Sequence, residues 1–248
     1  MAGHSKWANI KRHKAKQDAK RGKLYTKLIR ELTVAAKLGG GDPNSNPRLR
    51  SALDKALEAN MTRDVIDRAI KRGSGGMEGQ DLEEIRYEGY GPGGIAIMVD
   101  CMTNNRNRTV GEIRHAFTKN GGNLGTDGSV AYLFTKQGQL TFAPKVDEEK
   151  LMELALELNA DDILINDDKS VEIITAPESF LPIKDKLVQS GFHPEQAEVT
   201  MRAATNVAIT EKETAEKVLN LLDTIEDLDD VQSVYSNADI AEEILKLL

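Results

Sequence analysis

Along the first third of the chain, hydrophobic residues recur every three or four positions, which is the spacing of one face of an α-helix. A first row ends at three consecutive glycines, residues 39–41, which favour helix termination. A second row follows Asn46 and Pro47, residue types preferred at a helix cap and at the first helical position. A third row follows Thr62 as its cap and ends at Gly73. The three predicted helices turn these residues inward: Leu24, Leu28, Leu32 and Ala35; Leu49, Ala52, Leu53, Ala56 and Leu57; Val65, Ile66, Ala69 and Ile70.

Beyond residue 80 the pattern changes to short runs typical of β-strands. Leu82–Tyr90 and Ile95–Cys101 flank the sequence Gly-Pro-Gly-Gly at 91–94, which predicts a hairpin. A helix over Asn107–Asn120 and a strand over Ser129–Thr135 are expected to follow.

Residues 139–202 predict the order strand, helix, strand, strand, helix, strand, which is the ferredoxin-like plan. The predicted strands are Leu140–Phe142, Ile163–Asn166, Val171–Thr175 and Ala197–Arg202. The predicted helices are Asp147–Asn159, capped by Asp147, and Pro177–Ser190, ended by Gly191. A helix over Glu211–Leu228 capped by Thr210, a strand over Val231–Tyr235 and a helix over Ile240–Leu248 complete the prediction.

These elements predict an α+β protein with a basic three-helix domain followed by two α+β domains of ferredoxin-like type. Joining the first hairpin, helix and strand to the last helix and strand completes one sandwich, so the last domain is expected to be inserted into the middle one. The predicted limits are 1–76 for the helical domain, 80–136 with 204–248 for the discontinuous domain, and 137–203 for the inserted βαββαβ domain.

Composition excludes several classes of protein. Hydrophobic residues make up 40% and charged residues 29%, as in ordinary globular chains. The single cysteine, Cys101, cannot form an internal disulfide or a cysteine-rich zinc site, which favours a reducing compartment. The first residues lack the apolar core of a secretory signal, and no apolar run approaches the roughly 18 residues of a membrane span. We therefore expect a cytoplasmic protein without a membrane partner.

Charge is segregated along the chain. Residues 1–72 hold 18 Lys/Arg against 7 Asp/Glu, a net of +11, whereas residues 73–248 hold 15 against 33, a net of -18. The two values give the overall net charge of -7. Because a phosphate senses charges within a Debye length of about 8–10 Å, local charge decides polyanion binding. The basic region therefore indicates nucleic acid as the partner, despite the acidic whole.

The cations of the first thirty residues are the main candidates for that contact. Lys16, Lys20, Lys23, Lys27 and Arg30 are spaced to form one stripe on a continuous helix, although Gly22 interrupts the row. Trp7, the only tryptophan, lies among them, where an indole could stack on a base. The full set of candidates is Lys6, Trp7, Lys11, Arg12, Lys14, Lys16, Lys20, Arg21, Lys23, Lys27, Arg30, Arg106 and Arg108.

Two loops are candidates for further contacts. Asn105–Thr109 opens a helix, where two arginines beside free helix N–H groups could seat a phosphate or could simply be solvated. The Gly-rich segment Asn123–Gly128 is interpreted as a tight turn between a helix and a strand, with a nucleic-acid or ribosome contact as the alternative. Gly89, Gly91 and Gly94 match G-x-G-x-x-G, but a strand follows instead of a helix, which indicates a hairpin turn that could still approach a phosphate.

Catalytic patterns are missing from the sequence. The four histidines have no metal-binding spacing, and neither a nucleophile elbow nor a phosphate-binding P-loop occurs. Adjacent carboxylates such as Glu83-Glu84 and Asp229-Asp230 are interpreted as exposed, solvated side chains. We expect no enzyme activity, no metal and no cofactor, with an enzyme of unknown chemistry as the less favoured alternative.

Several blocks resemble the YebC/PmpR family: MAGHSKWANIKRHKAKQDAKRGKLYTKLIREL, AAKLGGGDPNSNPRLRSALDKALEANM, YEGYGPGGIAIMVDC, NRNRT and GGNLGTDGSVAYLF. The resemblance covers essentially the whole chain and implies a three-domain α+β protein of the bacterial cytosol. Members are described as transcriptional regulators that bind DNA, mitochondrial relatives activate translation, and some bacterial members resemble ribosome-associated factors. The expectation is a regulator that binds DNA, with ribosomal RNA as the alternative target; the oligomeric state stays open.

Overall fold

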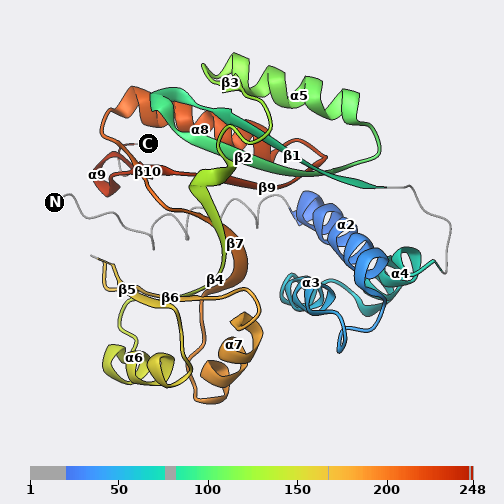
Figure 1. Cartoon of the computed structure of the whole chain (residues 1–248), viewed down its shortest axis with the longest axis vertical. Helices are drawn as coiled ribbons and strands as arrows, with labels where there is room; N and C mark the ends of the chain where they lie inside the picture. The colour runs from blue at the N-terminus through green and yellow to red at the C-terminus, as the bar shows by residue number, and fades with distance from the viewer. Residues whose placement is uncertain (1–20, 76–81, 167, 246, 248) are drawn as a thin grey trace.

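The structure, a computed structural model, describes residues 21–75, 82–166, 168–245 and 247. It has an N-terminal helical region followed by two regions in which helices pack on antiparallel sheets (Figure 1). The strands of the middle region are separated in sequence by the whole of the third region, because the last strand of the middle sheet comes after it. The predicted fold class, including the insertion, is therefore confirmed.

The helical region consists of α2 (Arg21–Gly39), α3 (Pro47–Glu58) and α4 (Arg63–Gly73). Asn46 joins α2 to α3: its side-chain oxygen accepts from the Leu49 N–H at 3.1 Å, and its amide donates to the carbonyls of Ala35 and Gly40, each at 2.8 Å. One buried side chain thus satisfies a free N–H group at the start of α3 and ties it to the end of α2. The core of this region contains Leu28, Leu32, Ala35, Ala36, Leu49, Ala52, Ala56, Met61, Ile66 and Ala69.

The middle sheet has the order β3-β1-β2-β9, with antiparallel neighbours throughout. Its strands are β1 (Glu83–Tyr90), β2 (Ala96–Thr103), β3 (Asn123–Leu124) and β9 (Val231–Ser236). The predicted hairpin is confirmed: β1 pairs with β2 across the short 3-10 helix η1 (Pro92–Gly94), where Gly93 and Gly94 adopt φ of 73° and 74°. Glycine adopts such positive φ values without steric cost. The G-x-G-x-x-G sequence of Gly89, Gly91 and Gly94 therefore forms the turn of a hairpin.

Helices α5 (Arg106–Lys119) and α8 (Lys212–Glu226) cover one face of this sheet (Figure 1). Phe117 of α5 and Leu221 of α8 meet Ile97 of β2 in that core. The opposite face of β2, at Ala96 and Met98, packs on a second cluster with Val130 and Phe134. Because both faces of β2 are covered, the strand is apolar almost throughout.

The inserted region has the sheet order β5-β6-β4-β7, again antiparallel. Its strands are β4 (Phe134–Phe142), β5 (Asp162–Ile165), β6 (Val171–Thr175) and β7 (Gln196–Ala203), and α6 (Glu148–Glu157) and α7 (Phe180–Gln189) cover one face (Figure 1). The two central strands are the first and third of the βαββαβ series, as in the ferredoxin-like plan. Asp147 caps α6 as predicted, accepting from the Lys150 N–H at 3.3 Å.

Two short parallel strands, β8 (Val207–Ile209) and β10 (Ala238–Ile240), pair beside the middle sheet, and α9 (Glu242–Leu245) follows. The prediction of a helix beginning at Ile240 is therefore wrong, because Ile240 pairs with Ile209 in the ladder. Residues 246 and 248 of that predicted helix lie outside the described residues.

The predicted strand Ser129–Thr135 is also wrong. Its first part forms a loop and the 3-10 helix η2 (Ala131–Leu133), and β4 begins only at Phe134. The reason is Glu88, a buried side chain whose carboxylate accepts from the N–H groups of Gly128, Val130 and Ala131 at 2.7–2.8 Å. A segment whose N–H groups are held by one carboxylate cannot offer them to a neighbouring strand.

The fourth strand of the middle sheet is instead β3, inside the segment interpreted as a turn. A Cβ at Gly89 would lie 2.6 Å from the Asn123 carbonyl oxygen, so only glycine lets β3 approach there. Three smaller expectations also fail: Leu57 is exposed, the side chain of Thr62 makes no cap hydrogen bond, and α8 is capped at Glu211 instead of Thr210. The predicted limit between residues 136 and 137 falls inside β4, and the domain ranges stay predictions.

Gly73 tests how closely α4 packs on α2. A Cβ at this position would overlap the Thr33 carbonyl oxygen and lie 2.8 Å from the Ala36 Cβ. Gly73→Ala should therefore destabilise the fold by about 1–3 kcal/mol, the usual cost of overpacking. Gly111→Ala is the matched control, because a Cβ there meets nothing within 4 Å on the exposed side of α5. It should stabilise by about 0.5–1 kcal/mol. Urea denaturation measures both, and equal effects would contradict the packing argument.

Candidate nucleic-acid interface

The structure describes only part of the predicted interface. Seven candidates lie outside the described residues, namely Lys6, Trp7, Lys11, Arg12, Lys14, Lys16 and Lys20. Arg21 is the first residue of α2, which continues through Gly22. The described part of the stripe, Lys23, Lys27 and Arg30, therefore lies on one helix with the predicted spacing of one face.

That face of α2 lies against the C-terminal end of α8. Lys23 Nζ donates to the Asp227 carbonyl at 2.6 Å, and Lys27 Nζ donates to the Glu226 carbonyl at 3.1 Å. The last carbonyls of a helix have no partner within the helix and carry its partial negative charge, so they bind cations well. Burial lowers the pKa of Lys27, although Glu226 and Asp227 act in the opposite direction.

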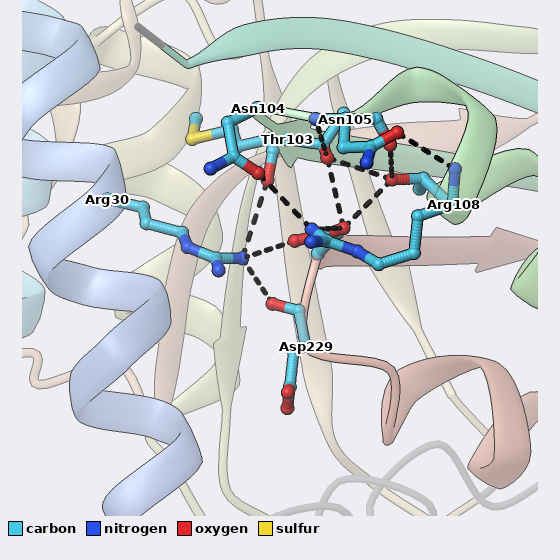
Figure 2. Close-up of polar contacts among 9 residues, drawn as sticks. Arg30, Thr103, Asn104, Asn105, Arg108 and Asp229 are labelled. Atoms are coloured by element: carbon cyan, nitrogen blue, oxygen red, sulfur yellow. Dashed lines mark hydrogen bonds and ion pairs between the residues drawn. The ribbon is translucent and has the colours of Figure 1, made fainter. Parts of the chain in front are cut away.

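Arg30 extends the contact to the loop before β9. Its Nη1 lies 3.3 Å from Asp230 Oδ1, and it also donates to the carbonyls of Asp229 and, at 3.4 Å, Met102. Figure 2 shows Arg30 reaching this loop from α2 while Arg108 reaches it from the opposite side. Two predicted phosphate-binding arginines thus converge on one internal carboxylate.

The start of α5 supplies the other partners of Asp230. Asp230 Oδ2 accepts three hydrogen bonds: from Arg108 Nη2 at 2.6 Å, from Thr109 Oγ1 at 2.8 Å and from Thr103 Oγ1 at 3.0 Å. Asn105 caps α5 by accepting from the Arg108 N–H at 3.1 Å, which fixes the helix start beside the carboxylate. Asp230 also anchors the chain through its backbone, because its carbonyl accepts from the Met102 N–H at 2.8 Å.

The interpretation of Asp229-Asp230 as an exposed pair is half wrong. Asp229 is exposed, and Figure 2 shows its carboxylate pointing away from the arginines, but Asp230 is only 1% exposed. Burial by itself would raise the pKa of the Asp230 carboxyl, yet the hydrogen bonds from Arg108, Thr109 and Thr103 outweigh it and lower that pKa. A buried carboxylate is tolerated here because three donors satisfy one of its oxygens.

The remaining candidate in this area is Arg106, which is exposed at the first residue of α5. An open pocket of about 650 Å³ is lined by Asn104 and Arg108, which lie two residues to either side of Arg106 in the sequence. Both acidic and basic side chains line this pocket. Its lining residues are Lys23, Arg30, Asn104, Arg108, Glu112, Asp227, Leu228, Asp229 and Asp230. Since the acidic members sit beside each cation, the pocket is less suited to a phosphate than an all-basic surface.

Two further findings concern the described part of the chain as a whole. Within it, no three or more His, Cys, Asp or Glu side chains are grouped so that they could hold a metal ion. None of its helices combines the length and the apolar character needed to cross a bilayer.

The residues that sequence reasoning missed are Asp230, Thr103 and Thr109. The available signal was position: Thr103 ends the apolar run of β2, and Asp230 directly precedes β9, which pairs with β2. Two polar groups at the same end of paired strands are expected to meet. Because Asp230 directly follows Asp229, the residue types by themselves suggest one exposed pair of carboxylates and give no sign of this contact.

The fold and the site define a three-part α+β protein whose basic helical region is docked on acidic regions by arginine and lysine side chains. The chain belongs to the TACO1/YebC family. The model of the TACO1/YebC protein N-terminal domain matches residues 5–76, and the model of the TACO1/YebC second and third domain matches residues 82–238.

Similar proteins cover the chain almost completely. A relative from Francisella tularensis subsp. novicida (strain U112) is 63% identical over 246 residues, 99% of each chain, and is named "Probable transcriptional regulatory protein". A relative from Francisella tularensis subsp. tularensis (strain SCHU S4 / Schu 4) is 62% identical over the same length and bears the same name. The crystal structure of the conserved hypothetical protein Aq1575 from Aquifex aeolicus matches with a TM-score of 0.82 at 49% identity, covering 93% of this chain and 95% of that one.

Asp230 should contribute more to stability than its neighbour. Asp230→Asn removes the charge that pairs with Arg30 and Arg108, and should lower the free energy of unfolding by about 1–3 kcal/mol. Asp229→Asn makes the same chemical change on an exposed side chain and should stay within about 0.5 kcal/mol of the parent chain. Urea denaturation at neutral pH compares the two. Equal effects would show that the buried carboxylate has no special role.

The lowered pKa of Asp230 also predicts a pH dependence. A carboxyl with a folded-state pKa below its unfolded value of about 3.9 contributes stability that is present above that value and lost as pH falls through the folded-state pKa. The difference in unfolding free energy between the parent chain and Asp230→Asn should therefore be constant from about pH 5 to 7 and shrink below about pH 4. A difference that stays constant down to pH 3 would contradict the assignment.

Proposed function

We propose that the chain is a regulator of gene expression that acts by binding nucleic acid through its basic N-terminal region, with DNA as the target. The observation that carries the proposal is the segregation of charge, +11 in residues 1–72 against -18 in residues 73–248. Such a distribution concentrates binding to a polyanion in one region, while the acidic remainder repels phosphates elsewhere.

The names of the relatives support the regulatory part of this proposal. Proteins 62–63% identical over nearly their full length are named probable transcriptional regulatory proteins. The helical region supports the binding part, because α2 presents cations at the spacing of one helix face. Arg63, Arg68, Lys71 and Arg72 add exposed cations on α4.

The proposed mode of action is binding without catalysis. In the charged cluster around Asp230, the carboxylate is taken up by Arg30, Arg108, Thr103 and Thr109. A carboxylate with that many donors and a lowered pKa is poorly suited to act as a general base at neutral pH. Its chemistry is that of a structural anchor.

Binding should be strongly dependent on salt. If six of the ten Lys/Arg between Lys6 and Arg30 neutralise phosphates, log K should fall against log salt with a slope of about -4 to -5. Fluorescence anisotropy with a labelled duplex DNA from about 0.05 to 0.3 M salt measures the slope. A slope near zero would show that the basic region does not contact phosphates.

Neutralising four N-terminal cations should weaken binding more than neutralising four on α4. Lys11, Lys14, Lys16 and Lys20 changed to Gln should reduce the affinity for duplex DNA by about 10³-fold at 0.1 M salt, because a side chain without charge no longer displaces a counterion from the DNA. Arg63, Arg68, Lys71 and Arg72 changed to Gln alter the net charge equally and should cost no more than about tenfold.

The same two variants decide between targets. Sedimentation with ribosomes under mild salt would separate a transcriptional regulator from a factor that binds ribosomal RNA. Loss of ribosome association in the first variant, with DNA binding unchanged, would overturn the assignment of DNA. Unchanged binding to both would overturn the role of the N-terminal cations.

A further inference from the structure

The cations of α2 and α3 that face the rest of the chain are already paired. On α2, Lys23 and Lys27 bind the last carbonyls of the α8 end, and Arg30 pairs with Asp230. These contacts use the same side chains that the proposed function assigns to phosphates. In the conformation described, therefore, part of the candidate binding face is occupied by the protein itself.

Helix α3 repeats this arrangement on different partners. Arg48 Nη2 lies 2.6 Å from Glu84 Oε1 on β1, and Arg50 Nη2 lies 2.6 Å from Asp185 Oδ2 on α7. Lys55 Nζ lies 3.2 Å from Glu198 Oε2 on β7. Cations of the helical region thus form ion pairs with carboxylates of both α+β regions.

No shared hydrophobic core is seen to reinforce these contacts in the described part of the chain. The cluster that contains α2, α3 and α4 is built from residues 24–70, and the clusters of the two sheets contain none of them. The side chains of Arg50 and Lys55 are each 45% exposed. Exposed ion pairs are weak and are screened by salt. The docking is therefore mainly electrostatic and open to competition by another polyanion.

We propose that the acidic groups around α3 and α2 act as an internal competitor for nucleic acid: they hold the helical region closed on the α+β regions, and a polyanion opens the chain by taking over the cations. This inference rests on the proposed function, since it concerns regulation of the same basic surface. A ligand that binds the open conformation better shifts the population toward it, and the apparent affinity falls with the fraction that is open.

The test removes the three carboxylate partners of α3 and leaves every cation and the Arg30–Asp230 pair in place. Glu84→Gln, Asp185→Asn and Glu198→Gln together weaken closure, and all three side chains are at least 30% exposed, so the fold should persist. If each pair favours the closed conformation about twofold, the triple variant should bind duplex DNA about eightfold more tightly. Thermal melting confirms that the variant is folded.

A matched control separates closure from net charge. Three exposed side chains of α6, which lies far from α3 in the fold (Figure 1), serve as the control: Glu149, Glu153 and Glu157. Changing them to Gln raises the net charge of the chain by three, as the triple variant does. This control should bind DNA within about twofold of the parent chain. Equal affinity of the triple variant and the control would overturn the internal competition while leaving the proposed function intact.

Opening itself can be followed by energy transfer between dyes on α2 and α6. Leu38→Cys and Leu156→Cys place the labels, since both side chains are well exposed. Cys101 should stay unlabelled, because it is buried and burial raises the pKa of its thiol to about 12.

Transfer efficiency should change on adding a duplex DNA long enough to span the basic region, and should change in the same direction when salt is raised without DNA. DNA binding without any change in transfer would overturn the proposal. Absence of DNA binding in the parent chain, the triple variant and the α6 control alike would overturn the proposed function, and the regulation with it.

Discussion

The contact between the helical region and the middle region depends on one buried carboxylate. Asp230 lies where β9 begins, and its two oxygens hold Arg30 of α2 and Arg108 of α5. An ionised group with almost no exposure is stable only when charged donors and hydroxyls replace its water, and Thr103 and Thr109 complete that shell. In the conformation described, Asp230 therefore joins α2 of the helical region to the start of α5 in the middle region, beside the contacts of Lys23 and Lys27 with the end of α8.

The cationic stripe of α2, which the proposed function assigns to phosphates, already has partners within the protein. The spacing of Lys23, Lys27 and Arg30, from which the sequence predicts a phosphate contact, matches the carbonyls at the end of α8 and the Asp230 loop. Helix ends and phosphates both offer clustered oxygen acceptors with negative charge. The basic helix α2 consequently has an internal ligand in this chain, and the proposed nucleic-acid ligand would compete with it for the same side chains.

Much of the fold followed from local sequence signals. The caps at Asn46 and Asp147, the hairpin at residues 91–94 and the ferredoxin-like order of the insertion depend on short-range chemistry that survives folding unchanged. The failures have a common cause. Glu88 draws the N–H groups of residues 128–131 away from a strand, and Gly89 admits β3 where local sequence predicts a turn. Both effects join residues about 35–43 positions apart in the chain, which a local window cannot detect.

The sequence by itself determined the fold class, the family resemblance and the segregation of charge, because periodicity, capping residues and net charge are properties of residue order. The tertiary structure alone decided what the charges contact. Asp229 and Asp230 are identical in type and adjacent, yet one is solvated and the other is buried between two arginines. Burial depends on which distant elements pack around a residue, and no count of charges along the chain contains that information.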